Sequence, residues 1–126
     1  MFKRNILSIL VSLLIMYLSL ANSHAFDKVP EFKIPFLDKI VHSIMYFTLM
    51  SAILFENRKS LRGTSHLFLI ALLPLFYGIL MEVLQFSLTE TRSGNIYDVF
   101  ANSSGILISI LIWPWCNNLI KKIFRY

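Results

Sequence analysis

Four long apolar segments constrain this chain more than any other feature. They cover approximately residues 6–23, 38–55, 65–88 and 96–115. A helix of about 20 apolar residues matches the hydrocarbon thickness of a lipid bilayer. Inside lipid every backbone amide needs a partner within the protein, which only helices and closed barrels provide. The sequence therefore predicts an all-α membrane protein with four transmembrane helices, forming a single domain over residues 1–126.

The composition excludes several other classes of protein. Hydrophobic residues make up 56% of the chain and charged residues 15%, with a mean hydropathy of +0.66. Soluble domains carry about 25% charged residues, so this chain has too few for a water-exposed surface. A single cysteine, Cys116, rules out an intramolecular disulfide and a cysteine-based zinc cluster. The net charge of +5 does not predict a nucleic-acid partner, because the basic residues flank the apolar segments instead of forming one stripe.

The basic residues also predict an orientation in the membrane. Eight of the twelve Lys and Arg residues flank the segments on one side, where Glu56 is the only acid. They are Lys3, Arg4, Arg58, Lys59, Arg62, Lys121, Lys122 and Arg125. Cytoplasmic loops are enriched in Lys and Arg. Both chain ends and the connector around Arg58 are therefore expected in the cytoplasm, and the other two connectors on the outer side.

The first apolar segment has two interpretations. Its basic start and the small-x-small pattern Ser23-His24-Ala25 are typical of a cleaved signal peptide. The same residues also fit a membrane helix that is retained, because tilt and flanking residues compensate for a small shortfall in length. Both interpretations leave the amino terminus in the cytoplasm and place the next connector outside it. We favour the retained helix.

Polar residues recur on one face of three of the segments. Asp38, His42 and Tyr46 follow one another at steps of four, which places them on a single helical face. The later stripes are Gly78, Glu82 and Gln85 in the third segment, and Asp98, Asn102, Gly105 and Ser109 in the fourth. In the predicted orientation all three stripes fall in the outer half of the bilayer. We therefore expect them to face one another inside the membrane.

Ionisable residues at that depth need a physical reason. A charge at the centre of a membrane helix costs about 2.5–3.5 kcal/mol on insertion scales. Hydrogen bonds between helices, worth about 0.6 kcal/mol each on average, offer one explanation. We favour a functional site, because helix association does not require acids, a histidine and an arginine at one depth. The candidate site residues are Asp38, Lys39, His42, Glu82, Gln85, Arg92, Asp98 and Asn102.

These residues permit more than one kind of chemistry. Glu82 and His42 are suited to act as an acid–base pair, so an enzyme stays open, although we favour a binding protein. His42, Glu82 and Asp98 offer one imidazole and two carboxylates, which is enough for a divalent ion. The sequence has no His-x-x-x-His or comparable paired ligand spacing, so we expect neither a metal nor another cofactor.

The order and spacing of these residues resemble the VanZ-like family. The matching motifs are Asp38-Lys39-x-x-His42, Glu82-x-x-Gln85, Arg92 and Asp98-x-x-x-Asn102-x-x-Gly105. The resemblance covers nearly the whole chain. It implies a small multi-pass protein of the bacterial cytoplasmic membrane, with the first helix retained. The namesake of the family is linked to resistance to the glycopeptide antibiotic teicoplanin, which implies a role in the cell envelope.

We hypothesise that the outward polar residues bind an envelope ligand, such as a lipid-linked cell-wall precursor or a phospholipid head group. Lys39 and Arg92 would contact its anionic group, and the forked guanidinium of Arg92 suits phosphate or carboxylate. The acids would hold these cations and His42 in place, and the amides of Gln85 and Asn102 would supply neutral hydrogen bonds. Two alternatives stay open, namely a membrane hydrolase or transferase acting on an envelope lipid, and a structural or assembly subunit without a ligand. The sequence does not predict the oligomeric state.

Overall fold

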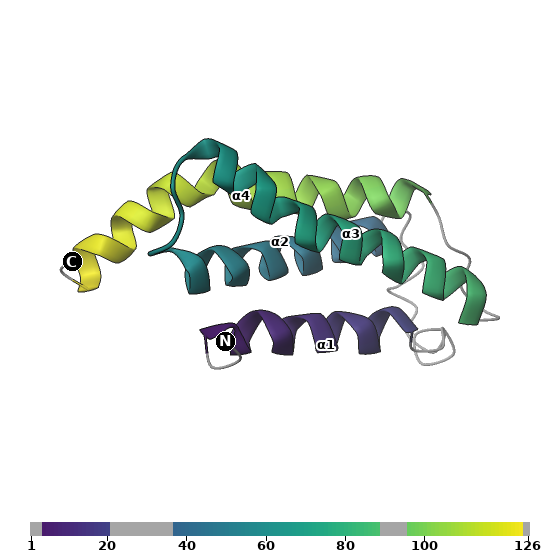
Figure 1. The fold of residues 1–126 in the computed structure, drawn as a ribbon. Coiled ribbons are helices and arrows are strands. Elements are labelled where there is room, and N and C mark those ends of the chain that lie inside the picture. Colours follow the sequence, from purple (N-terminus) through teal and green to yellow (C-terminus); the bar gives the residue numbers. More distant parts are fainter. Residues whose placement is uncertain (1–3, 21–36, 89–95, 125–126) are drawn as a thin grey trace.

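The computed structural model is all-helical over the residues that it describes, which are 4–20, 37–88 and 96–124. Its helices are α1 (Ile6–Leu20), α2 (Leu37–Asn57), α3 (Thr64–Leu88) and α4 (Ile96–Phe124). They pack side by side into an elongated bundle in which α2 lies mainly against α4 (Figure 1). The amino terminus, the connector between α2 and α3, and the carboxyl terminus lie at the same end of this bundle.

The helices agree with the predicted segments except at the end of α4. α2 and α3 begin within one residue of the expected positions, and α4 begins where the fourth segment was expected to begin. The prediction that this helix ends near Trp115 is wrong, because α4 continues to Phe124 with Pro114 inside it. Proline removes one hydrogen bond and kinks a helix without necessarily ending it. In Figure 1 the yellow last part of α4 turns away from the line of its green first part.

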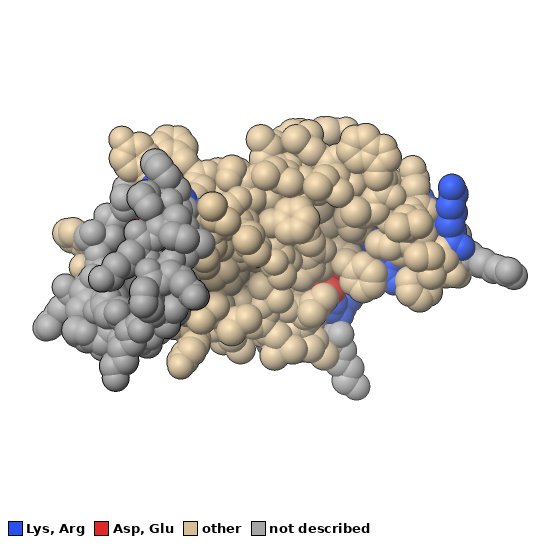
Figure 2. Space-filling view, turned by 180° about the vertical axis from the view of Figure 1, so that it is seen from behind, with Lys and Arg blue, Asp and Glu red and all other residues tan. Residues whose placement is uncertain are grey.

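The bundle has the surface of a membrane protein. Three helical stretches are long and apolar enough to cross a membrane, namely Lys39–Asn57, Thr64–Leu88 and Ile96–Phe124. Large hydrophobic side chains cover the outside, and Leu73 and Phe76 on α3 are 66% and 64% exposed. On the face shown in Figure 2, uncharged residues cover the broad middle, and the blue Lys and Arg atoms gather mainly toward one end. This arrangement of apolar outside and polar inside indicates a membrane protein.

α1 is shorter than the other helices but is attached to them by specific contacts. Its 15 residues span about 22 Å at 1.5 Å per residue, and residues 21–23 of the predicted segment lie outside the described part. The carboxylate of Glu56 on α2 accepts hydrogen bonds from the backbone N–H groups of Leu7 and Ser8. A carboxylate at this position satisfies free donors and interacts favourably with the helix dipole. These hydrogen bonds attach the start of α1 to the end of α2.

α2 and α4 approach each other closely at Gly105. A Cβ atom on Gly105 would overlap the backbone carbonyl oxygen of Ser43 and would lie 2.9 Å from the backbone nitrogen of Phe47. One turn further along α4, the hydroxyl of Ser109 is 2.8 Å from that of Ser51. Small residues of this kind let membrane helices pack backbone against backbone, where neighbouring lipid offers no hydrophobic driving force.

We expect Gly105→Ala to destabilise the bundle, because the new methyl group meets the backbone of α2, which cannot move aside unless the two helices separate. Overpacking of this kind costs about 1–3 kcal/mol. Thermal unfolding of the purified protein in detergent would show a lower midpoint. Ile108→Ala is the control, because Ile108 is 45% exposed and its truncation should change the midpoint less. Equal midpoints for wild type and Gly105→Ala would contradict the close contact.

Candidate functional site

Three helices bring four polar side chains together at the end of the bundle opposite the chain ends. They are His42 from α2, Glu82 from α3, and Asp98 and Asn102 from α4. Each of the four residues is at most 7% exposed. The stripes expected from the sequence therefore face one another. We call these four residues the polar cluster.

His42 lies at the centre of the polar cluster. Its Nδ1 is 3.1 Å from Oδ1 of Asn102 and 3.9 Å from Oε1 of Glu82, and its Nε2 is 4.0 Å from Oδ2 of Asp98. An amide carbonyl oxygen can only accept, so Nδ1 donates to Asn102. The lone pair of the neutral ring is then on Nε2, on the side of Asp98. This arrangement suits the imidazole to exchange a proton or to bind a cation.

Lys39 lies at the edge of the polar cluster. Its Nζ is 3.5 Å from Oδ1 of Asp98, and its side chain is 32% exposed against 6% for that of Asp98. Lys39 precedes His42 by one turn of α2, so it lies nearer to the end of the bundle. A positive charge is thereby held at the more accessible side of the polar cluster.

The other predicted site residues have different positions. Gln85 is 2% exposed and donates to the backbone carbonyl of Ser19 at 2.7 Å, so its amide attaches α3 to α1. Asp38 lies in the first turn of α2, but its side chain is outside the described part of the structure. Arg92 also lies outside the described residues. Its contact with an anionic ligand stays a prediction.

Tyr46 and Gly78 border the polar cluster, although neither was among the predicted site residues. A Cβ atom on Gly78 would lie 3.1 Å from Nδ2 of Asn102 and 3.1 Å from Cε1 of Tyr46, so the glycine leaves room for both side chains. The Tyr46 hydroxyl and the Asn102 Nδ2 are buried and have no hydrogen-bond partner among the described residues. Their positions follow from the sequence, because Tyr46 is four residues after His42 and Gly78 is four residues before Glu82.

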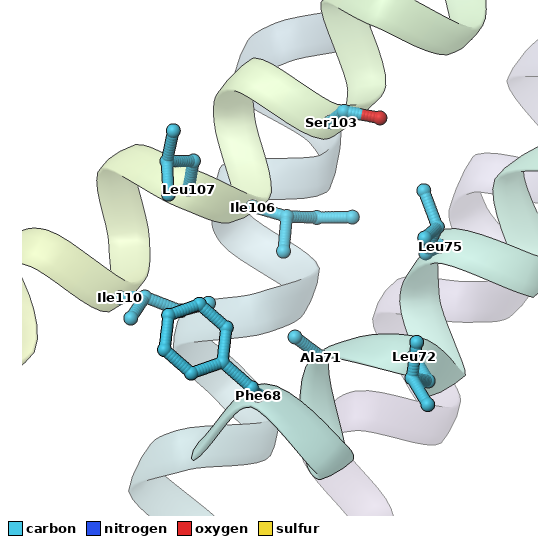
Figure 3. A pocket seen from close by; sticks show the side chains of 8 residues that line it. All are labelled: Phe68, Ala71, Leu72, Leu75, Ser103, Ile106, Leu107 and Ile110. Atoms are coloured by element: carbon cyan, nitrogen blue, oxygen red, sulfur yellow. The ribbon is translucent and has the colours of Figure 1, made fainter. Parts of the chain in front are cut away.

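An apolar pocket of about 300 Å³ lies between α3 and α4. Phe68 and Leu75 line it from α3, and Ile106 and Ile110 line it from α4 (Figure 3). The hydroxyl of Ser103, which also lines the pocket, donates to a backbone carbonyl of its own helix. The pocket therefore offers mainly hydrocarbon to anything that enters it.

The comparison with protein families gives one result over nearly the whole chain. The family model described as VanZ/LLP1 matches residues 3–117, which include all four residues of the polar cluster. A search of curated proteins and a search of solved structures each find no match.

We expect Tyr46→Phe to leave the midpoint of thermal unfolding unchanged or slightly raised when no ligand is added, because a buried donor without a partner is costly. Tyr77→Phe is the matched comparison, since the Tyr77 hydroxyl donates to the backbone carbonyl of Ser12. Its removal should cost about 1 kcal/mol and lower the midpoint. If both variants lowered the midpoint equally, the Tyr46 hydroxyl would have a partner within the protein.

Proposed function

This chain belongs to the VanZ/LLP1 family, and we propose that it is a bacterial cytoplasmic-membrane protein whose polar cluster binds a phosphate-bearing lipid of the cell envelope. Four buried polar side chains from three membrane-length helices support this proposal above all. Ionisable residues within a membrane are costly and commonly mark a binding site or a conduction path. Lys39, at the edge of the cluster and 32% exposed, would contact the phosphate.

We further propose that all four helices cross the membrane, with both chain ends in the cytoplasm. Every described Lys and Arg except Lys39 belongs to the bundle end that holds the chain ends. The positive-inside rule assigns that end to the cytoplasm. The polar cluster then lies toward the outer face. Tilt and local thinning of the bilayer would accommodate the shorter α1.

The apolar pocket supports a lipid as the ligand. Leu75 in the pocket precedes Glu82 in the polar cluster by seven residues, or about 10 Å along α3. A single lipid molecule is therefore long enough to place its head group in the polar cluster and a hydrocarbon chain in the pocket. Phospholipids and lipid-linked cell-wall precursors share this combination of phosphate and chain.

We also propose that the protein changes susceptibility to glycopeptide antibiotics. Glycopeptides act outside the membrane on cell-wall peptides. In the proposed orientation the polar cluster faces the same side. A protein that binds an envelope lipid there would change how much of the antibiotic's target is available.

An enzyme is the second candidate, because His42 lies between two carboxylates at 3.9 Å and 4.0 Å. The reaction would be hydrolysis or group transfer on the same lipid, with Glu82 and His42 as the acid–base pair. Glu82→Gln would then abolish turnover while the lipid stays bound. A binding protein without catalysis would leave the lipid chemically unchanged.

The orientation predicts opposite locations for two reporter fusions. A reporter fused after Arg62 should lie in the cytoplasm, and a reporter fused after Gly94 should lie outside it. Paired cytoplasmic and periplasmic-type reporters at each position would measure this. Cytoplasmic signals at both positions would contradict the outward position of the polar cluster.

The effect on susceptibility is measured as teicoplanin tolerance in a sensitive Gram-positive host, whose cells carry each variant at matched membrane levels. Wild type should raise tolerance to teicoplanin, and Lys39→Ala and Glu82→Gln should lose most of the increase. Thr48→Ala is the control, because Thr48 is exposed on α2 and its hydroxyl donates to the backbone carbonyl of Ile44 in the same helix. No increase with wild type would reject the effect on susceptibility, and equal protection by all variants would reject the polar cluster as its source.

Direct lipid binding is measured separately, by native mass spectrometry of the purified protein. Wild type and Thr48→Ala should retain a phosphate-bearing lipid, and Lys39→Ala should retain at least tenfold less, since a charge-assisted contact is worth about 1.5–3 kcal/mol. The mass of the bound lipid distinguishes a phospholipid from a cell-wall precursor. A change in protein abundance alone, without a change in bound lipid, would indicate a structural or assembly subunit.

A further inference from the structure

Three side chains of the polar cluster, one from each of three helices, present metal-binding atoms to one another. One nitrogen or oxygen atom from each of His42, Glu82 and Asp98 lies within 4.8 Å of the other two, and all three residues are buried. We propose that they hold one divalent transition-metal ion, with Zn²⁺ and Mn²⁺ as the best matches. Imidazole suits zinc, and carboxylate suits manganese, so a mixed set of one imidazole and two carboxylates fits either ion.

The hydrogen bond from His42 to Asn102 prepares the imidazole for this role. Because Nδ1 donates to the amide at 3.1 Å, Nε2 carries the lone pair. Histidines that bind metals are commonly fixed in this way by a bond from the other ring nitrogen. Nε2 is also the nitrogen that lies 4.0 Å from Oδ2 of Asp98. Two ligands of one tetrahedral Zn²⁺ lie roughly 3.4 Å apart, so atoms that now lie within 4.8 Å of one another would have to approach by up to about 1.4 Å. The carboxylate of Glu82, whose Oε1 is now 3.9 Å from Nδ1, would move toward the Nε2 side.

Two buried donors that border the polar cluster lack an acceptor among the described residues, which independently indicates a ligand in this part of the bundle. Nδ2 of Asn102 and the hydroxyl of Tyr46 have no hydrogen-bond partner among the described residues, and both residues are 1% exposed. Both side chains lie against Gly78, one turn of α3 before Glu82. Three protein ligands leave a further coordination position open on the ion. A water molecule or a phosphate oxygen that enters with the ion would give these donors an acceptor and offset the cost of burying them.

The absence of paired ligand spacing in the sequence does not count against this site. Spacing such as His-x-x-x-His arises when one helix supplies two ligands, whereas here α2, α3 and α4 supply one each. Metal sites in bundle cores are built from side chains on facing helices. The sequence-based expectation of no metal depended on a pattern that such a site does not require.

The proposed metal site is separate from the proposed lipid binding and would give that binding a chemical basis. Carboxylates repel a phosphate, whereas a divalent ion that they hold attracts one. The metal site uses the polar cluster but needs no lipid in order to form. The two proposals can therefore fail separately.

The test is a metal titration of the full-length protein, purified in detergent and freed of metal with a chelator. Isothermal titration with Zn²⁺ should give one ion per chain, and binding should raise the midpoint of thermal unfolding. Affinity should fall as the pH is lowered, because each ligand must lose its proton to bind the metal. Titration with Co²⁺ as a coloured substitute should give the visible spectrum of nitrogen and oxygen ligands.

Variants assign the ion to the site. Asp98→Asn is nearly isosteric and, like His42→Ala, should lower the Zn²⁺ affinity at least tenfold. His66→Ala should leave the affinity unchanged, because His66 lies near the start of α3, far from the polar cluster. Unfolding midpoints without metal show whether each variant is folded.

Three results would overturn the proposal. They are a wild type that shows no saturable binding of Zn²⁺, Mn²⁺ or Co²⁺, a folded Asp98→Asn that binds as tightly as wild type, and loss of binding in His66→Ala. Stoichiometric metal binding without lipid retention or altered teicoplanin tolerance would uphold the metal site and contradict the proposed function. Lipid retention by a protein that binds no metal would uphold the lipid binding and contradict the metal site.

Discussion

The close contact between α2 and α4 at Gly105 is the constraint on which the other contacts depend. The carbonyl of Ser43 lies directly against this glycine, and His42 is the residue before it. Asn102 precedes Gly105 by three residues, so the same helix pairing aligns it with His42 and sets their hydrogen bond of 3.1 Å. A larger residue at position 105 would separate the helices and lengthen that bond. The geometry of the polar cluster is therefore set by a residue that takes no part in it.

Packing and the proposed function depend on the same residues in this bundle. Lipid is as apolar as leucine, so membrane helices associate through close packing and hydrogen bonds instead of the hydrophobic effect. Here these bonds join helices at Ser51 and Ser109, and also at His42 and Asn102. A substitution in the polar cluster would consequently act on stability as well as on the proposed ligand binding. Measurements on such variants are informative only beside a measurement of folding.

The sequence predicted most of the fold, because a bilayer demands apolar helices of a particular length, and helical periodicity predicted which faces meet. Three features depend on the tertiary structure. α4 continues to Phe124, since the end of an apolar run marks where a helix leaves the lipid and not where it stops. Gln85 shares a stripe with Glu82, yet its amide reaches the backbone of α1. The grouping of three ligand atoms within 4.8 Å requires the packing of three helices and leaves no local pattern.

α4 is long enough to reach from one surface of a membrane to the other. Its 29 residues include Asp98 in the first turn and Lys121 and Lys122 in the last. In the proposed orientation the lysines are attracted to anionic head groups of the inner leaflet, and Asp98 lies about 35 Å away along the helix. Bilayer thickness would then decide how deeply Asp98 is immersed at the outer surface. A thinner membrane would raise the polar cluster toward water, and a thicker one would submerge it, so the protein would respond to the lipid composition around it.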